Sequence, residues 1–188
     1  MAEERIDLSR FINAKGKGVE KEKIEMPAVL ESVLRYCLKD ASERMGKGEL
    51  VIPFSALAVG ETLFMEEHPG DEVADCFHSA RKTVENARGA KAYGFCYDGF
   101  IEIGPNNQQH DCVIAEGGCP GEPYGHAIGL PYTVDKDGVP TFADEPIYVS
   151  RALNYMSTLV DLEDEESESE EAGAEEAGSE EAGSEEAE

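Results

Sequence analysis

The chain has 188 residues, of which 40% are hydrophobic, and a formal net charge of -25, so it is long enough for one domain with its own core. A protein this acidic repels nucleic acid and anionic membrane surfaces, and we expect neither to be a direct partner. There is no apolar run near the ~18 residues of a membrane helix, the N-terminus is charged, and five cysteines lack CxxC spacing. Together these features predict a cytoplasmic protein with reduced thiols.

The first 25 residues are predicted to form a flexible arm. They mix charges of both signs and contain two glycines in a polar stretch, Gly16 and Gly18. A few apolar residues there, such as Phe11 and Ile12, are expected to dock on the domain.

A helix is predicted to begin near Pro27 and to end at Gly46 and Gly48. Its apolar residues recur at intervals of three and four and form one continuous face: Val29, Leu30, Val33, Leu34, Cys37, Leu38, Ala41 and Met45. Cys37 lies within this face, so we interpret it as a core residue.

Residues 50–59 and 61–68 are predicted to form a hairpin or a bent pair of strands, with Pro53 at an edge or a bulge. A second helix should follow, capped by Asp71 or the residue before it and ended by Gly89. Its apolar face comprises Val73, Phe77, Ala80, Val84 and Ala87.

Residues 91–103 are rich in aromatic and β-branched residues. They predict one long strand bent at Asp98 and Gly99, or two strands joined there. Three further strand candidates begin near His110, Tyr124 and Val139, and residues 150–160 could form a closing helix.

This order of elements lacks the regular alternation of strands and helices that is typical of a parallel sheet. It predicts a single α+β domain over residues 26–160, with an antiparallel sheet of about five or six strands and two or three helices packed on one face. If the other face is apolar and open, it would be a dimer surface or a ligand platform.

The last 28 residues, 161–188, are predicted to be a disordered acidic tail. They contain 15 of the 41 acidic residues, no Lys or Arg and one Leu, so they hold -15 of the net charge. Such a segment cannot bury enough apolar surface to offset the entropy of ordering its backbone. We expect it to keep the domain soluble, and docking on a basic partner is an alternative.

The sharpest candidate for chemistry is the pair His110 and Cys112 at the start of a predicted strand. Residues two apart point to the same face, so an imidazole would lie beside a thiol and could activate it or bind zinc with it. Further ligands would have to come from residues without diagnostic spacing: Cys119, His126, Cys76, His78 and His68. The alternative is that Cys112 belongs to the core.

A second candidate is the acidic group at the start of the second helix, in which Asp71 and Asp75 lie four residues apart near Glu67. These carboxylates could hold a hard cation such as magnesium. Acidic residues in a first helical turn also stabilise the helix dipole without any ligand, and we favour that interpretation.

The third candidate is the Gly- and Pro-rich stretch of residues 117–126, which is typical of a binding loop. Cys119 lies in it and is expected to be the most exposed and reactive thiol. The stretch matches neither a phosphate-binding loop nor a nucleophile elbow.

These features leave three hypotheses. The leading one is a non-enzymatic interaction or accessory module that binds a protein partner or forms a homodimer through its sheet. The alternatives are a Cys/His hydrolase or thiol enzyme that uses His110, Cys112 or Cys119, and a metal-binding regulatory domain. No cofactor is predicted, and no metal ligands are assigned.

Overall fold

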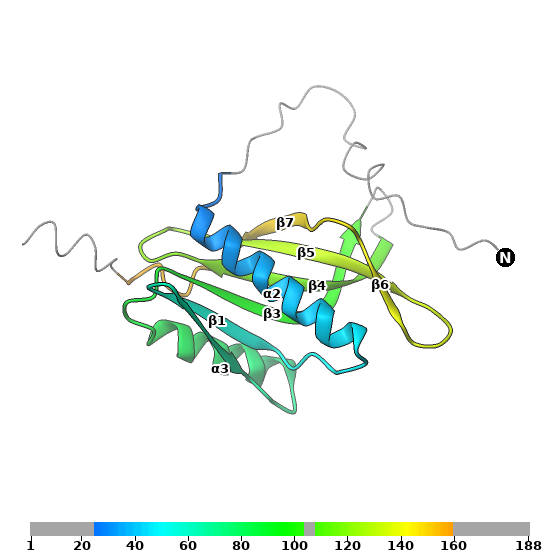
Figure 1. The fold of residues 1–188 in the computed structure, drawn as a ribbon. Coiled ribbons are helices and arrows are strands. Elements are labelled where there is room, and N and C mark those ends of the chain that lie inside the picture. Colours follow the sequence, from blue (N-terminus) through cyan, green and yellow to red (C-terminus); the bar gives the residue numbers. More distant parts are fainter. Residues whose placement is uncertain (1–24, 104–107, 160–188) are drawn as a thin grey trace, which may run out of the picture.

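The computed structural model describes residues 25–103 and 108–159, which form an α+β domain with an antiparallel sheet, as predicted (Figure 1). The predicted arm and the acidic tail lie outside the described residues, apart from Glu25. The elements in chain order are α2 (Ala28–Gly46), β1 (Phe54–Val59), β2 (Thr62–Glu67), α3 (Val73–Glu85), β3 (Ala92–Ile103), β4 (Gln108–Gly118), β5 (Gly125–Val134), β6 (Pro140–Phe142) and β7 (Ile147–Ala152).

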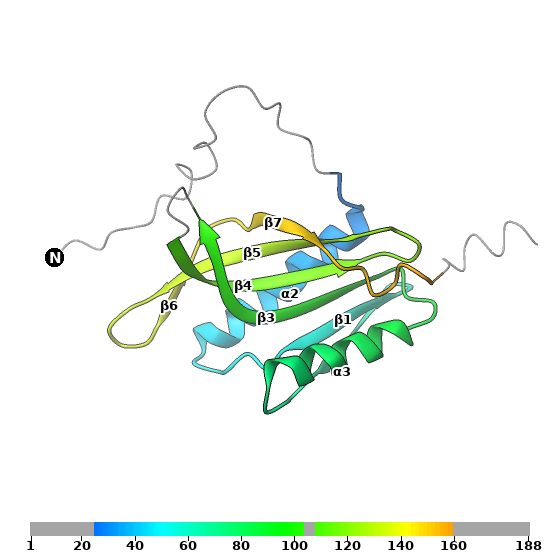
Figure 2. The ribbon, with the colours of Figure 1, turned by 180° about the vertical axis from the view of Figure 1, so that it is seen from behind.

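The sheet has seven strands in the order β2-β1-β3-β4-β5-β6, and β7 also pairs with β5. All strand pairs are antiparallel. The predicted β1–β2 hairpin is confirmed, with Gly60 at a φ of 58° in its turn. Residues 92–103 form one strand rather than two, and this strand bends strongly toward its end (Figure 2).

Helix α2 packs on the first face of the sheet. Six of the eight residues of the predicted apolar face are buried: Leu30, Val33, Leu34, Cys37, Leu38 and Ala41. Met45 is half-buried, and Val29 in the first turn is exposed, so the prediction is wrong for Val29. The buried residues contact alternate strand residues, including Phe54, Cys96 and Val113. Gly94 lets the helix approach closely, because a Cβ there would lie 3.0 Å from the Cys37 Sγ.

Helix α3 packs on the second face, so the prediction that the helices share one face is wrong. Its residues Ala80 and Val84 join a separate core cluster with Tyr93 and Phe95, whose strand neighbour Cys96 faces α2. Adjacent strand residues point to opposite faces, which places the two helices on opposite sides of the sheet (Figures 1 and 2).

The start of α3 and the end of the domain also differ from the predictions. Glu72 rather than Asp71 occupies the N-cap of α3, and no side-chain hydrogen bond caps the helix. The closing helix is wrong, because the chain continues β7 to Ala152 and then forms a turn. The Asn154 side chain holds this turn through bonds to the Cys119 and Glu122 carbonyls, both 2.7 Å.

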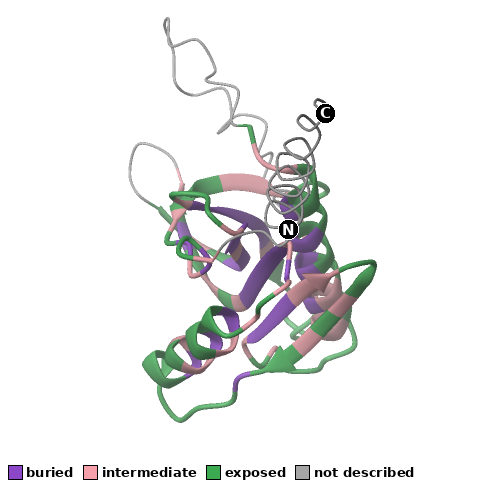
Figure 3. Ribbon diagram, turned by 90° about the vertical axis from the view of Figure 1, so that its left-hand side faces the viewer, coloured by how far each residue is buried: buried purple, intermediate pink, exposed green. Residues whose placement is uncertain are grey.

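The second face is only partly covered by helix in the described residues. Buried residues gather along the strands in the middle of the molecule, and the outer side of each helix is exposed (Figure 3). Seen from behind, α3 lies in front of β1, whereas no helix lies in front of β4 and β5 (Figure 2). We call this uncovered area the open face and define it by Tyr97, Ile103, Glu116, Ile147 and Val149. Val149 belongs to it because a Cβ at Gly129 would meet both the Val149 Cγ2 and the Cys112 Sγ.

Candidate functional site

The structure places His110 and Cys112 on the second face of β4, as their spacing predicts. Cys112 is fully buried in a small apolar cluster with Ile101 and Ile114. The cluster is tight, because a Cβ at Gly129 would lie 2.6 Å from the Cys112 Sγ. Burial raises the pKa of the Cys112 thiol to about 12, so the thiolate that a nucleophile or zinc ligand requires is disfavoured.

Cys119, the other thiol of the proposed thiol enzyme, lies elsewhere. Cys119 belongs to the core beneath α2, on the opposite side of the sheet from Cys112. It is the most exposed of the five cysteines, as predicted, but at 9% it is still buried. The structure therefore does not bring Cys112 and Cys119 into one site.

The acidic group near α3 is exposed, whereas the neighbouring His68 is buried. Asp71, Asp75 and Glu67 are exposed, and the Glu67 Oε1 pairs with the Arg44 Nη1 at 2.7 Å. His68 is 1% exposed and lies between two hydroxyls, with its Nε2 2.8 Å from the Ser55 Oγ and its Nδ1 3.0 Å from the Ser79 Oγ.

Ser55 belongs to β1 and Ser79 to α3, so His68 joins the second helix to the sheet. Burial lowers the pKa of His68, which favours the neutral ring. Because Ser55 is itself 1% exposed, this Ser-His pair is out of reach of a substrate, and we interpret it as structural.

The predicted binding loop contributes two rings to a cluster at one end of the sheet. Tyr124 lies edge-on to His126 at 5.5 Å between centroids, and the Tyr148 hydroxyl lies 3.4 Å from the His126 Nδ1. The Arg151 guanidinium lies 4.1 Å from the centre of the Tyr124 ring. Burial and the charge of Arg151 lower the pKa of His126, so the ring is favoured in its neutral form.

Histidines and cysteines elsewhere do not converge either. Cys76 is buried and His78 exposed, as expected for residues two apart on a helix. Within residues 25–103 and 108–159, no three His, Cys, Asp or Glu side chains are grouped so that they could hold a metal ion.

A site that the sequence analysis missed lies on the second face, where β3, β4 and the final turn meet. Its centre is Glu116 on β4, which shares this face with Ile114 and Cys112. The Tyr97 hydroxyl, from the neighbouring strand β3, lies 3.4 Å from the Glu116 Oε2. Both side chains are half-buried, so the carboxylate is partly shielded from water but remains accessible.

Aromatic rings hold this site in place. Tyr97 packs against Phe77 of α3 at 5.0 Å and against Phe95 at 5.4 Å between ring centroids. Tyr155, from the final turn, stacks on Tyr93 with centroids 5.7 Å apart and the rings 16° from parallel. Tyr97 therefore has a fixed position beside Glu116.

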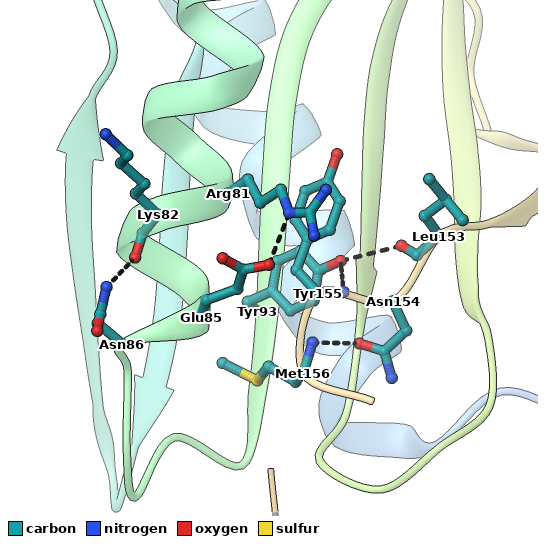
Figure 4. Close-up of polar contacts among 9 residues, drawn as sticks. All are labelled: Arg81, Lys82, Glu85, Asn86, Tyr93, Leu153, Asn154, Tyr155 and Met156. Atoms are coloured by element: carbon teal, nitrogen blue, oxygen red, sulfur yellow. Dashed lines mark hydrogen bonds and ion pairs between the residues drawn. The ribbon is translucent and has the colours of Figure 1, made fainter. Parts of the chain in front are cut away.

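The final turn is fixed by hydrogen bonds to the same strand (Figure 4). The Tyr93 hydroxyl donates to the Leu153 carbonyl and accepts from the Tyr155 backbone N–H, each at 3.1 Å. Arg81 of α3 lies over the Tyr155 ring at 5.8 Å and pairs with Glu85 at 2.6 Å (Figure 4). Strand, helix and turn thus form one rigid border of the open face.

The Glu116 carboxyl lies in an environment that disfavours its charged form. Burial raises its pKa, and the hydrogen bond from Tyr97 only partly opposes this effect. Burial and the nearby charge of Glu116 raise the pKa of Tyr97, so the phenol keeps its proton and can donate. None of the ion pairs among the described residues includes Glu116.

The position of Glu116 in the strand pattern is a signal that the sequence already contains. Residues 112, 114 and 116 alternate along a strand, and Cys112 and Ile114 are apolar, so a glutamate at the next position on this face departs from the pattern. Its aromatic neighbours come from residues 77–97 and 155, and only the strand pairing brings them together.

In the described residues, no helix is both long enough and apolar enough to cross a membrane.

Comparisons of the chain with protein-family models, with curated proteins and with solved structures find no match.

Proposed function

We propose that the domain is a non-enzymatic interaction module that binds a basic protein partner through the open face. The observation that carries this proposal is the set of apolar side chains left on the second face without a helix over them, namely Ile103, Ile147 and Val149. Apolar side chains gathered on an uncovered surface are typical of contact with another protein.

Charge supports a basic partner over a second copy of the chain. Residues 1–160 carry a formal charge of -10 and the tail carries -15, so the net charges of two copies repel each other. The same charge attracts a basic protein and accelerates its association. The tail contributes solubility and long-range attraction in this account.

The chemistry of the cysteines and histidines supports a binding role over catalysis. Cys112 is fully buried with a raised pKa, and Cys119 lies on the other face of the sheet. A nucleophile and its base must lie within hydrogen-bond reach at an accessible site, whereas both of these thiols are packed in apolar clusters.

Site-specific photo-crosslinking in the native host tests the proposal. A photoreactive phenylalanine replaces Val149, which is 37% exposed on the open face, and in a matched control it replaces Tyr36, which is 45% exposed on α2. We expect a discrete adduct with a basic protein from position 149 and none from position 36. Equal adducts from both positions, or an adduct of two copies of this chain, would contradict the proposed partner.

A further inference from the structure

We infer that Glu116 and Tyr97 form a receptor for one lysine or arginine side chain of the partner, an inference that rests on the proposed function and specifies its chemistry. The site is defined by the carboxylate of Glu116, the hydroxyl of Tyr97 and the apolar surface of Ile114 beside them.

The first argument is the unbalanced charge. Glu116 is half-buried beside apolar and aromatic side chains, and its only partner among the described residues is the neutral Tyr97 hydroxyl at 3.4 Å. A carboxylate in such a place costs free energy unless a cation accompanies it. By contrast, the guanidinium groups of Arg35, Arg44 and Arg81 all have carboxylate partners.

The second argument is that the apolar surface beside Glu116 fits a cation with an apolar stem. Tyr97 packs against both apolar clusters of the second face, so its ring continues the apolar surface that leads to Glu116. A lysine or arginine has an apolar stem and a charged head, and the stem can lie on such a surface while the head reaches a carboxylate. Metal ions lack that stem, and they usually take several carboxylates or soft ligands.

The third argument is rigidity. The Tyr97 ring is held by Phe77 and Phe95 at 5.0 and 5.4 Å, and Glu116 lies on a central strand paired on both sides. A receptor whose groups are already in place loses little conformational entropy when it binds. The acceptor atoms therefore need no rearrangement to receive a cation.

The test uses the full chain and a probe that represents one basic side chain. N-acetyl-lysine methylamide is titrated into labelled protein and followed by NMR, and N-acetyl-norleucine methylamide, which has an apolar chain without the ammonium group, is the matched ligand. We expect saturable shifts centred on Tyr97, Glu116 and Ile114, and at least fivefold weaker binding of the norleucine compound. Bound probe should also lower the pKa of the Glu116 carboxyl.

Two variants separate a receptor from general attraction to an acidic surface. E116Q should weaken the lysine probe at least fivefold, whereas E102Q, which removes the same charge from an exposed position on β3, should leave binding within twofold. Equal effects of the two variants, or shifts spread over the acidic surface, would overturn the inference. A thermal melt of E116Q checks that the domain remains folded.

The probe titration and the crosslinking experiment can fail independently of each other. If a partner crosslinks to position 149 but E116Q binds the lysine probe as the wild type does, the receptor is wrong and the open-face proposal stands. If the lysine probe binds at Glu116 but no partner crosslinks to position 149, the receptor stands and the proposed function fails.

Discussion

At the scale of single residues, buried polar side chains in this domain hold elements together. His68 links β1 to α3 through two serine hydroxyls, and Asn154 fixes the final turn with three hydrogen bonds. Each such residue satisfies backbone or side-chain groups that would otherwise be buried without partners. Glu116 differs from both because it is half-buried and has no cationic partner among the described residues.

His68 makes the stability of the domain depend on pH. Burial lowers its pKa in the folded protein, although the charge of Glu66 acts in the opposite direction. The unfolded chain therefore binds the proton at a higher pH, and stability is fully present above about pH 6.5 and is lost as the pH falls through the folded-state value. The free energy of unfolding, measured by urea denaturation, should fall between pH 7 and pH 5.

Two histidine variants test this assignment. His68→Gln should lower stability at pH 7 by about 1–3 kcal/mol through lost hydrogen bonds and should reduce the pH dependence. His78→Gln, at an exposed position on α3, should keep the wild-type slope. A wild-type slope in the His68 variant would show that other groups, such as His126, cause the dependence.

At the scale of elements, the fit between α2 and the sheet depends on a glycine. A Cβ at Gly94 would lie 3.0 Å from the Cys37 Sγ and 3.1 Å from the Val33 Cγ1, in a packed core with little room to shift. Gly94→Ala should therefore destabilise the domain by about 1–3 kcal/mol, measured by urea denaturation.

Gly46 offers a matched control. It is the last residue of α2, and nothing lies within 4 Å of the Cβ that alanine would add. Gly46→Ala should leave stability unchanged or raise it by up to about 1 kcal/mol, because alanine is the better helix former. Similar losses for the two variants would contradict the close approach of α2 at Gly94.

The elements that could be predicted from the sequence are those with strong local patterns. The apolar residues of α2 follow the helical period, and Gly60 marks the β1–β2 turn, so local chemistry determines both. The closing helix was wrong because Asn154 bonds to carbonyls of residues 119 and 122, more than 30 positions away. The face that α3 occupies likewise depends on strand pairing that no local pattern encodes.

The candidate site was less predictable than the fold. The spacing of His110 and Cys112 correctly indicates a shared face of β4, but it cannot show that the thiol is buried. Glu116 and Tyr97 lie 19 positions apart and become neighbours only when β3 pairs with β4. Their proximity follows from the register of the sheet.

At the scale of the whole molecule, the two faces of the sheet differ in how they are covered. Helix α2 covers the first face, and α3 covers only part of the second, which leaves an apolar open face on a strongly acidic protein. An apolar surface on a charged molecule combines contact area with long-range attraction. This combination is the basis of the proposed basic partner.

The acidic tail is predicted to contribute charge rather than stability. Removing residues 161–188 should change the free energy of unfolding by no more than about 0.5 kcal/mol, since a segment with one Leu and no aromatic residue can bury little surface. The shortened protein should be less soluble near neutral pH. A large loss in a urea denaturation experiment would show that the tail packs against the domain.

The central claim is that the open face, and no other surface, binds the partner. Calorimetric titration of the crosslinked partner into wild-type protein, Val149→Asp and Tyr36→Asp tests this claim most directly, because both substitutions add one charge at an exposed apolar position. We expect at least tenfold weaker binding for Val149→Asp, binding within twofold of wild type for Tyr36→Asp, and weaker binding at high salt. Equal affinities for the two variants, or a loss confined to Tyr36→Asp, would show that the partner does not bind at the open face.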